Sequence, residues 1–387
     1  MASIYKLNKS WAARLSYQEN GKRKRLNKAG FSTKSAARAW ATTQEAELQK
    51  HGGNHLSKQS IIDYYQEWFD TFKKPRVAPA TQRRYMATKE VIVRYFGNRS
   101  LDSIDYADYQ EFINKLASSH KLGTVKKVHG QVRAAIRKAF QMGKISADFT
   151  DGAEISGKPG KKPEDKFLDL DDMQRLLEYC LMNIKFITDV DRAMYICALL
   201  TGMRYEEVAG LTWDCVNFEK HTLKVNKAWD HVEHKFGPTK NESSMRTIKI
   251  DSQLVLMLKE WRQIVNEYMN RRHRSNPNNF VFLARSRGAV SPETVNHLLR
   301  KVYQQGIISK PITFHGLRHT HASYLISSGI STHYISERLG HKNTIVTETT
   351  YAHLFKKKRI EEEKRAMKML ENLDKRKQKM SSEIHQK

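Results

Sequence analysis

One stretch of the chain reads Phe314-His315-Gly316-Leu317-Arg318-His319, then Leu339-Gly340-His341, and then Thr349-Thr350-Tyr351-Ala352-His353. It contains an arginine able to clamp two phosphate oxygens, histidines able to transfer protons, and a tyrosine able to act as a nucleophile. Together these residue types suit chemistry on a phosphodiester, and the rest of the sequence is interpreted around them.

The length and charge of the chain point to a large polyanion as its partner. At 387 residues the chain is too long for one ordinary domain, so two or three are expected. It has 68 Lys and Arg against 41 Asp and Glu, a formal net charge of +27, interleaved with 6 Trp, 16 Tyr and 15 Phe. This combination favours DNA or RNA as the partner over a generically basic soluble protein.

The cysteines and the hydropathy pattern indicate an intracellular protein. Cys180, Cys197 and Cys215 form no C-x-x-C pair, which argues against a zinc ribbon or a disulfide framework and predicts core thiols. No apolar run follows a basic start, and no window reaches 18 uncharged apolar residues. We therefore expect neither export nor a membrane partner.

Residues 1–52 predict a three-stranded sheet with one helix. Apolar and polar positions alternate over 4–7 and 11–17, and a basic strand begins at Lys22 after a tight Asn-Gly turn. Ser32-Thr33 is a capping signal for the Ala-rich helix that follows. The exposed face of this sheet is expected to read bases in a major groove, and the alternative is a solvated basic hairpin. The basic residues assigned to this face are Arg14, Lys22, Lys24 and Lys28.

Residues 57–148 have the periodicity of four helices joined by short turns, which predicts a helical bundle. The apolar stripes run through residues 61–72, 85–96, 106–116 and 125–140, and their aromatic residues are interpreted as core rather than as base-stacking platforms. The basic positions are expected to follow a DNA backbone without sequence preference. They include Arg83, Arg84, Lys126 and Lys127, together with Lys89, Arg133, Arg137 and Lys138.

Residues 149–166 shift to Gly, Lys, Pro and Asp, a composition typical of a linker. Within them, Gly152 to Lys158 matches most of a phosphate-loop pattern. Pro159 stands where that pattern needs the Ser or Thr that holds magnesium, and no buried strand precedes it. ATP binding is therefore not expected here.

Residues 167–387 predict a mixed α+β domain with a carboxy-terminal tail. Helical periodicity runs through 173–180 and 194–200, and two strands at 221–225 and 245–250 flank a turn-rich segment that contains Lys240. Phe280-Val281-Phe282-Leu283 is interpreted as a further short strand. The expected fold is multidomain, mainly α with small β-sheets.

Cleaving a phosphodiester requires stabilising charge on the nonbridging oxygens, activating a nucleophile and protonating a leaving oxygen. No Asp/Glu cluster that would hold magnesium accompanies the reactive residues, so guanidinium groups are expected to replace the metal. Arg204 and Arg318 are the candidates, because a planar fork grips two phosphate oxygens. An unperturbed tyrosine has a pKa of about 10, so attack by Tyr351 needs nearby cations or a base, which His315 and His341 can supply.

These motifs resemble the tyrosine recombinases, specifically the integrases of Gram-positive phages and conjugative transposons. The amino-terminal sheet looks like the arm-site binding domain of that family, and the bundle looks like its core-site binding domain. The stretches that carry the resemblance are Thr201-Gly202-Met203-Arg204-Tyr205-Glu206-Glu207, Thr239-Lys240-Asn241, His315-Gly316-Leu317-Arg318-His319-Thr320, Leu339-Gly340-His341 and Thr350-Tyr351.

The resemblance implies a role for individual residues. Tyr351 corresponds to the nucleophile, Lys240 to the lysine of a hairpin, and Glu207 to the acidic residue that supports the site. Lys235 and Lys249 flank the same hairpin and are the alternatives to Lys240. The implied catalytic set is Arg204, Lys240, His315, Arg318, His341 and Tyr351.

The resemblance also implies a reaction and its partners. Tyr351 attacks one strand to give a 3′-phosphotyrosyl link and a free 5′ hydroxyl, and a 5′ hydroxyl from a second duplex resolves the link. Because the link keeps the bond energy, no cofactor is implied, neither ATP nor a metal. Four protomers exchange strands through a Holliday junction, integrating and excising a prophage or transposon. The implied partners are core and arm attachment sites in double-stranded DNA, a host bending protein and an excision factor, near the nucleoid of a bacterial cytoplasm.

Other interpretations stay open. His315, His319 and His321 suggest a metal site, although no Cys or acidic partner completes it. A type IB topoisomerase shares the chemistry but acts as a monomer, and the amino-terminal sheet argues against it. A noncatalytic regulator on an inactive integrase fold is opposed by the intact catalytic set. The tail after Tyr351 either docks on a neighbouring protomer or is a solvated amphipathic end.

Overall fold

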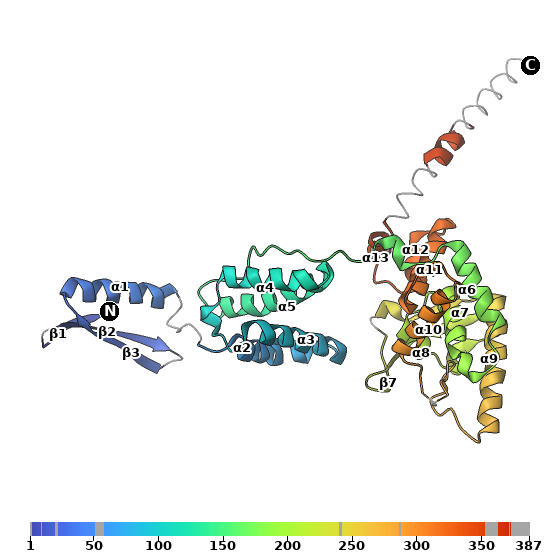
Figure 1. The fold of residues 1–387 in the computed structure, drawn as a ribbon, viewed down its shortest axis with the longest axis horizontal. Helices are drawn as coiled ribbons and strands as arrows, with labels where there is room; N and C mark the ends of the chain where they lie inside the picture. Colours follow the sequence, from blue (N-terminus) through green and yellow to red (C-terminus); the bar gives the residue numbers. More distant parts are fainter. Residues whose placement is uncertain are drawn as a thin grey trace, which may run out of the picture. The chain divides into compact units, whose positions relative to one another are not determined.

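The computed structural model describes residues 2–8, 10–19, 22–50, 58–239, 242–285, 288–352, 363–370 and 372. The chain divides into two units, residues 1–160 and residues 161–387. Helices dominate both units, and the described strands form three small antiparallel sheets (Figure 1). The predicted fold class is confirmed. No described helix combines the length and the apolar composition that crossing a bilayer requires.

The amino-terminal sheet is built as the strand pattern predicts. β1 (Ser3–Leu7), β2 (Ser10–Glu19) and β3 (Lys22–Phe31) pair antiparallel in chain order, and α1 (Lys34–Lys50) covers one face (Figure 1). The side chain of Thr33 accepts the Ala36 N–H at 3.1 Å, which caps α1. The small core between sheet and helix is formed by Ala13, Leu15, Ala37 and Ala41.

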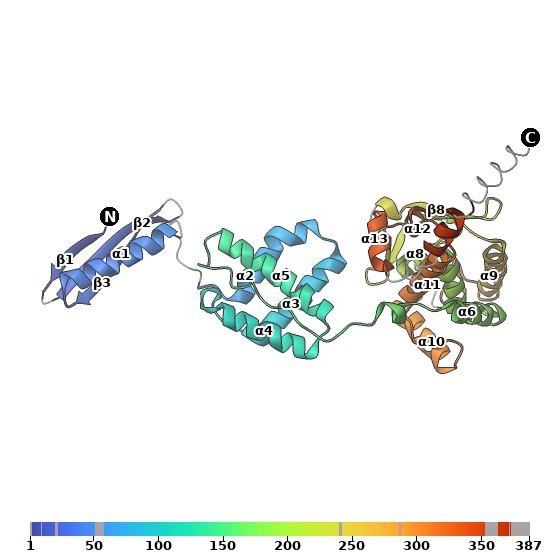
Figure 2. The same ribbon diagram turned by 90° about the horizontal axis from the view of Figure 1, so that it is seen from above.

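The bundle follows with four helices, α2 (Ile61–Trp68), α3 (Pro79–Phe96), α4 (Tyr106–Ser119) and α5 (Leu122–Gln141) (Figure 2). Their starts follow from local chemistry, since the Ser60 hydroxyl accepts the Asp63 N–H and the Asp105 carboxylate accepts the Asp108 N–H. The first predicted helix does not continue regularly to Phe72. After Trp68 it becomes a π-helical turn (Phe69–Lys73) and then a 3-10 turn (Lys74–Arg76).

Aromatic side chains fill the core of the bundle, as predicted. Tyr64, Tyr65, Tyr109 and Phe112 are buried, and the Tyr64 hydroxyl donates to the Ala135 carbonyl at 3.1 Å. The prediction was wrong for Tyr106 and Phe140, which are each 46% exposed. Tyr106 is the first residue of α4, and its hydroxyl donates to the carbonyl of Gly152 at 3.1 Å instead of entering the core.

The segment with a linker composition is partly bound to the bundle. The Gln110 side chain donates to the Glu154 carbonyl at 3.0 Å and accepts the Glu154 N–H at 2.9 Å. Lys158 exchanges two backbone hydrogen bonds of 2.9 Å with residues 120 and 122 at the start of α5. A Cβ at Gly157 would lie 2.7 Å from the Leu122 backbone. The phosphate-loop-like residues therefore run extended along the bundle.

The carboxy-terminal unit is organised around a helix that is buried on all sides. In α7 (Val190–Thr201), every residue from Ala193 to Leu199 has no exposed surface, as expected for a helix that is apolar all round. The Asp169 carboxylate caps α6 by accepting the Asp172 N–H. The other helices of the unit are α6 (Leu170–Met182), α8 (Tyr205–Ala209), α9 (Ser252–Arg271), α10 (Pro292–Gln304), α11 (Phe314–Ser327), α12 (Thr332–Leu339) and α13 (Thr344–Thr350).

The strands of this unit are short. β4 (Val216–Asn217), β5 (Thr222–Val225) and β8 (Arg246–Lys249) form one antiparallel sheet, so both predicted strands are present and pair with each other. The hairpin of β6 (Ala228–Asp230) and β7 (Lys235–Gly237) was not predicted. The stretch 280–283 is fully buried but makes only isolated bridges at Phe280 and Leu283 in the described structure.

Candidate active site

The carboxyl end of α12 is the anchor of the candidate site. Gly340 has left-handed backbone angles (φ 67°, ψ 49°), and the N–H of His341 donates back to the Ser336 carbonyl at 3.0 Å. A Cβ at Gly340 would lie 3.0 Å from Nη1 of Arg246 and from the Ser243 carbonyl. Glycine therefore lets neighbouring groups approach the last carbonyls of the helix.

Three arginines bind three consecutive carbonyls at this helix end. They come from separate elements, namely the start of α8, strand β8 and helix α11. The carboxyl end of a helix carries partial negative charge, which favours cations. The hydrogen bonds are Arg246 Nε to Arg338 O at 2.7 Å, Arg318 Nη2 to Leu339 O at 2.8 Å, and Arg204 Nη2 to Gly340 O at 3.2 Å.

Arg318 is the most deeply buried of the three. It is 2% exposed, and its Nη1 donates to the Gly202 carbonyl at 2.7 Å. Gly202 ends α7 in the left-handed conformation, and a Cβ there would lie 2.7 Å from the side chains of His321 and Leu339. Burial, reinforced by the charge of Arg204, lowers the pKa of Arg318 to about 9, so the group remains protonated at neutral pH.

Glu207 is the counterion of this cluster. Its carboxylate accepts Arg204 Nη1 at 2.7 Å and Arg246 Nη2 at 2.9 Å. Burial alone would raise its pKa, but the charges of Arg246 and Arg204 and their hydrogen bonds bring the pKa down to about 2. Three guanidinium groups therefore share one carboxylate as counterion, and this surplus of positive charge among largely buried groups suits an anion.

Arg246 was not among the residues predicted for the site. A signal was present, because side chains alternate along a strand and Arg246 therefore shares a face of β8 with the buried Ile248. An arginine on the inward face of a strand is unusual unless it is paired. Here it is paired with Glu207.

Tyr351 lies just after α13 and is 2% exposed. Burial raises the pKa of its phenol above the ordinary value, and the charge of Arg318 opposes that rise. Its hydroxyl lies 2.9 Å from Nδ1 of His319. Its ring belongs to a small apolar cluster with Ala322, Ile326, Ile335 and Leu339. The cluster joins the tyrosine to the helix end that holds the arginines.

The predicted histidines lie near the residues described above. His315 is exposed on α11, with its ring centroid 4.8 Å from that of His319. His341 has Nδ1 2.7 Å from the Thr347 hydroxyl. Burial, then the charges of Arg318 and Arg204, lower the pKa of His341 to about 3, so it is neutral at pH 7. The alternative of a histidine metal site gains no support, because the described residues contain no group of three potential metal ligands.

Lys240 lies outside the described residues. Its two sequence alternatives are on the strands that flank it. Lys235, on β7, lies 3.8 Å from the carboxylate of Glu233. Lys249, on β8, donates to the Lys220 carbonyl at 3.2 Å.

The amino-terminal sheet does not carry its basic residues on one face. Arg14 is opposite Asn27 on the face that α1 leaves open, and it donates to the Asn27 side chain at 3.1 Å. Lys28 is opposite Ala13, whose side chain is in the helix-side core, so Lys28 points to the other face, as Lys24 does by alternation. The side chain of Lys22 lies outside the described residues. The prediction of one shared basic face was therefore wrong for Arg14 and Lys28.

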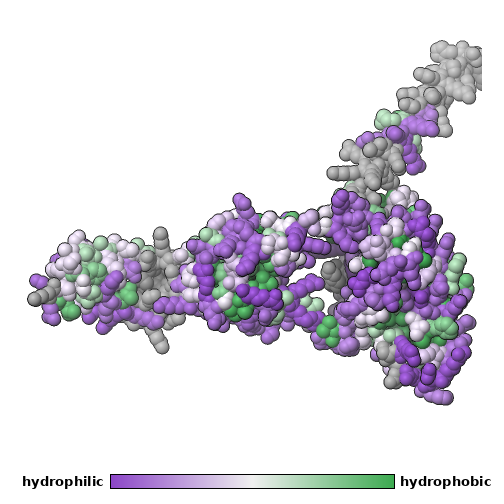
Figure 3. Space-filling model, viewed as in Figure 1, coloured by the Kyte–Doolittle hydropathy of each residue, from purple (hydrophilic) through white to green (hydrophobic). Residues whose placement is uncertain are grey.

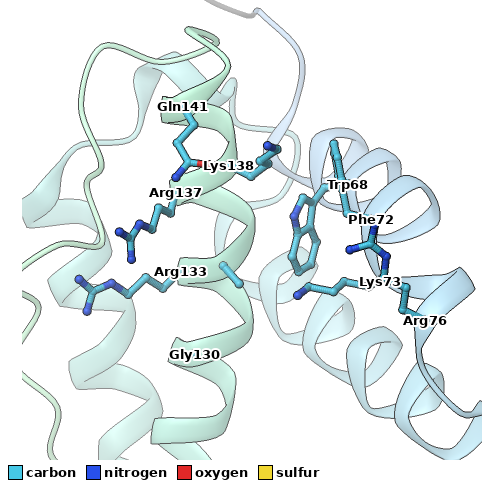
Figure 4. A pocket seen from close by; sticks show the side chains of 10 residues that line it. Trp68, Phe72, Lys73, Arg76, Gly130, Arg133, Arg137, Lys138 and Gln141 are labelled. Carbon is cyan, nitrogen blue, oxygen red and sulfur yellow. The ribbon is translucent and has the colours of Figure 1, made fainter.

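The basic residues predicted for the bundle are on its surface, where Arg83, Arg84, Lys126 and Lys127 are all exposed. Hydrophilic side chains cover much of the visible surface of the bundle (Figure 3). Lys126 has the spacing of one helix face with two residues of α5 that line a cleft of about 500 Å³, Arg133 and Arg137. The rest of the cleft includes Trp68, Phe72, Lys73, Arg76 and Lys138 (Figure 4).

Comparison with known proteins places the whole arrangement in one family. The sequence model of the phage integrase family matches residues 166–358, that of the phage integrase N-terminal SAM-like domain matches 61–117, and that of an arm DNA-binding domain matches 3–48. The tyrosine recombinase XerC-like protein of Caldanaerobacter subterraneus is 24% identical over 373 residues, covering 88% of this chain and 91% of the relative.

Solved structures have the same fold. The Tn1549 transposon integrase in complex with a circular intermediate DNA aligns with a TM-score of 0.66 at 17% identity, covering 79% of this chain and 99% of that one. The lambda integrase tetramer bound to a Holliday junction aligns with a TM-score of 0.58 at 17% identity, covering 88% and 96%. The chain belongs to the phage integrase family, the tyrosine recombinases.

Proposed function

We propose that this site-specific DNA recombinase cuts and rejoins DNA with Tyr351 as its nucleophile and with buried arginines holding the scissile phosphate. The observation that carries the proposal is the trio of guanidinium groups on carbonyls 338–340, with Tyr351 packed against Leu339 beside them. Preorganised cations in a water-poor pocket stabilise the charge that develops on phosphoryl oxygens. They supply this without moving during the reaction.

Each catalytic residue then has a task. Arg204 and Arg318 bind the nonbridging oxygens of the phosphate through their planar forks. The Tyr351 oxygen attacks phosphorus, the bond to the 5′ oxygen breaks, and Lys240 protonates the departing oxygen. His315 and His341 border the phosphate and assist proton movement. Glu207 keeps two arginines in place and balances part of their charge.

The reaction stores the energy of the broken bond in the 3′-phosphotyrosyl link. A 5′ hydroxyl from a second duplex attacks that link and reverses the chemistry, so neither ATP nor a metal is needed as a cofactor. Two such rounds between paired duplexes pass through a Holliday junction. The outcome is integration or excision of a mobile element such as a prophage or a transposon.

The domains divide the recognition of DNA. Residues 1–52 bind arm sites, residues 57–148 bind core sites, residues 149–166 connect the two parts, and residues 167–387 carry the chemistry. The exposed cations of the bundle, among them Arg83, Arg84, Lys126 and Lys127, contact phosphates. In the amino-terminal sheet, the register supports Arg14 on the open face as a base or phosphate contact.

The working form is a homotetramer on double-stranded DNA, by analogy with the lambda integrase tetramer on a Holliday junction. A host protein that bends DNA and an excision factor complete the assembly. The site of action is the nucleoid in the cytoplasm of a bacterial host.

A nicked suicide duplex carrying the core site tests the proposal. Cleavage releases a short fragment that diffuses away, so the covalent complex accumulates and is visible as a shifted band on a denaturing gel. Tyr351→Phe is expected to abolish attachment while the affinity for the duplex stays within about twofold, since only one hydroxyl is lost. Attachment that persists in this variant would refute the nucleophile assignment.

The same substrate separates three classes of protein. A recombinase and a type IB topoisomerase both become attached to the duplex, whereas a noncatalytic regulator does not. Only a recombinase joins two duplexes when a second core site is supplied. Relaxation of a supercoiled plasmid without any joining would assign the protein to the topoisomerases instead.

A further inference from the structure

A second residue touches the oxygen of the proposed nucleophile. His319 follows Arg318 on α11, and its Nδ1 lies 2.9 Å from the Tyr351 hydroxyl, with the two rings edge-to-face at a centroid distance of 5.7 Å. The geometry is that of a hydrogen bond between a phenol and an imidazole. Activation of the tyrosine was predicted for His315 and His341, whereas His319 was named individually only as a possible metal ligand.

The neighbouring imidazoles have other partners. His341 Nδ1 lies 2.7 Å from the Thr347 hydroxyl. His321 uses Nδ1 toward the Leu199 carbonyl at 2.7 Å, and its Nε2 accepts Arg338 Nε at 3.0 Å. Through these hydrogen bonds the buried His321 links α11 to α7 and α12. In the described part of the chain, the hydrogen bond that is seen between an imidazole and the Tyr351 phenol is that of His319.

The surroundings of His319 keep its ring neutral at pH 7. Burial, then the charges of His315, Arg318 and Lys166, lower the pKa of His319 to about 4. A neutral ring with its hydrogen on Nε2 has an acceptor at Nδ1, where the phenol lies. A phosphate placed on Arg318 brings a negative charge close to this ring and makes imidazolium easier to form. Proton acceptance is thereby linked to substrate binding.

We propose that His319 is the catalytic base that accepts the phenolic proton when Tyr351 attacks the scissile phosphate. The bond from the Tyr351 oxygen to phosphorus forms as the phosphorus bond to the 5′ oxygen breaks, and the phenolic proton moves to His319 Nδ1. The 5′ oxygen takes its proton from a different group, assigned above to Lys240. During rejoining His319 returns its proton to the departing tyrosine. This inference rests on the proposed role of Tyr351.

His319→Asn is the variant that tests it. Asparagine has a similar reach and keeps a hydrogen-bonding group near the phenol, but it cannot take up a proton at neutral pH. Single-turnover attachment to the suicide duplex is expected to slow by about 100-fold, the lower range for loss of a general base, with DNA affinity unchanged. His333→Asn is the matched control, because His333 is exposed on α12 and pairs with Glu337. It is expected to react like the wild type.

A second substrate distinguishes a base from an acid. When sulfur replaces the 5′ bridging oxygen, the leaving group departs without a proton. This duplex is expected to restore the rate of Lys240→Ala but not that of His319→Asn. Restoration of His319→Asn by sulfur, or a wild-type rate on the ordinary duplex, would overturn the inference. Neither result would affect the Tyr351→Phe experiment, so the proposed function is judged separately.

The pH profile and chemical rescue supply readouts that a structural role would not move. The rate of His319→Asn is expected to keep rising with pH, because the phenol must then ionise without a base, with Arg318 as the charge that favours its ionised form. In the wild type, His315, Arg318 and Lys166 are the charged or titratable groups that act on His319. The wild-type rate is expected to level off at lower pH. Should His319→Asn fold poorly, His319→Ala is tested with added imidazole. A concentration-dependent gain of rate supports proton transfer by His319, and no gain from a folded His319→Ala opposes it.

Discussion

The helical bundle and the carboxy-terminal unit use positive charge in opposite ways. The bundle buries aromatic rings such as Tyr109 and keeps cations such as Lys126 and Arg137 at its surface. The carboxy-terminal unit takes Arg318 into its interior and holds it by two backbone carbonyls. Exposed charges cost little, whereas a buried guanidinium requires partners to offset its lost hydration.

This difference separates two tasks. Exposed cations attract a DNA backbone through many weak and interchangeable contacts. In the proposed mechanism the buried cations act on one phosphate, and they must be held in one geometry before it arrives. Substitutions in the buried set should therefore change chemistry or folding, while substitutions in the exposed set should change only affinity.

Arg318→Lys is expected to have the largest effect among substitutions of the largely buried arginines Arg204, Arg246 and Arg318, which are called the buried set. Lysine keeps the positive charge but loses the planar fork that binds the carbonyls of Gly202 and Leu339 and that, in the proposed mechanism, also binds the phosphate. The rate of covalent attachment to a suicide duplex is expected to fall by about 10³-fold, with duplex affinity within about threefold of the wild type. Arg300→Lys, an exposed position on α10, is the control and should keep the full rate. A normal rate for Arg318→Lys would show that buried forks are not what the reaction uses.

Glu207→Gln tests how the buried cations are tolerated. In the wild type, the pKa of Glu207 is lowered from about 4.5 to about 2. The carboxylate therefore contributes stability that is fully present above pH 4.5 and is lost as the pH falls toward 2. The shift corresponds to about 3 kcal/mol, which is the expected loss of unfolding free energy in Glu207→Gln at pH 7. Urea unfolding at several pH values measures it. The gap between wild type and variant should narrow below pH 4.5, and a gap independent of pH would contradict this account.

Sequence patterns predicted the elements of both regions for the same physical reason. Apolar spacing and caps, such as the Thr33 cap of α1, are local signals. They predicted the bundle, α7 and the pairing strands around Lys240. They missed the β6–β7 hairpin, whose strands have three residues each and whose Trp229 depends on Phe280, 51 positions later, at a ring distance of 4.9 Å. A strand of three residues is too short to show the alternation of apolar and polar residues by which strands are predicted.

The site was predictable only in part, because its residues are far apart in the sequence and are brought together by the tertiary structure. The motif spacing singled out Arg204, Arg318 and Tyr351. Strand alternation could have singled out Arg246, but its partners became known only from the structure, where β8 lies beside the carboxyl end of α12. The contact between His319 and Tyr351 was likewise not predictable, because it forms only when α13 brings Tyr351 next to α11. In the amino-terminal sheet, successive residues of a strand point to opposite faces. Arg14 and Lys28 therefore lie on different faces of the sheet, although both are basic residues of paired strands.

Arg137→Ala has the smallest expected effect, and it tests whether an exposed cation of the bundle contributes only to DNA binding. Arg137 is one of the residues that line the cleft, and in Figure 4 its side chain extends from α5 to the same side as Arg133. By helical spacing this face also carries Lys126. Removing one phosphate contact should weaken duplex binding by less than about tenfold and reduce the slope of log affinity against log salt by about 0.9. Fluorescence anisotropy between 50 and 200 mM salt, a range chosen because the slope is steep there, measures both quantities.

Lys115→Ala on α4 is the control for Arg137→Ala, since this lysine packs over the ring of Tyr95. It should leave the salt slope unchanged. Attachment at saturating protein should also be unchanged in Arg137→Ala, because an exposed cation of the bundle adds to binding before the chemical step and not to the step itself. An Arg137→Ala variant that binds normally but reacts slowly would place this cation with the buried set, and the division of tasks between the two regions would then be wrong.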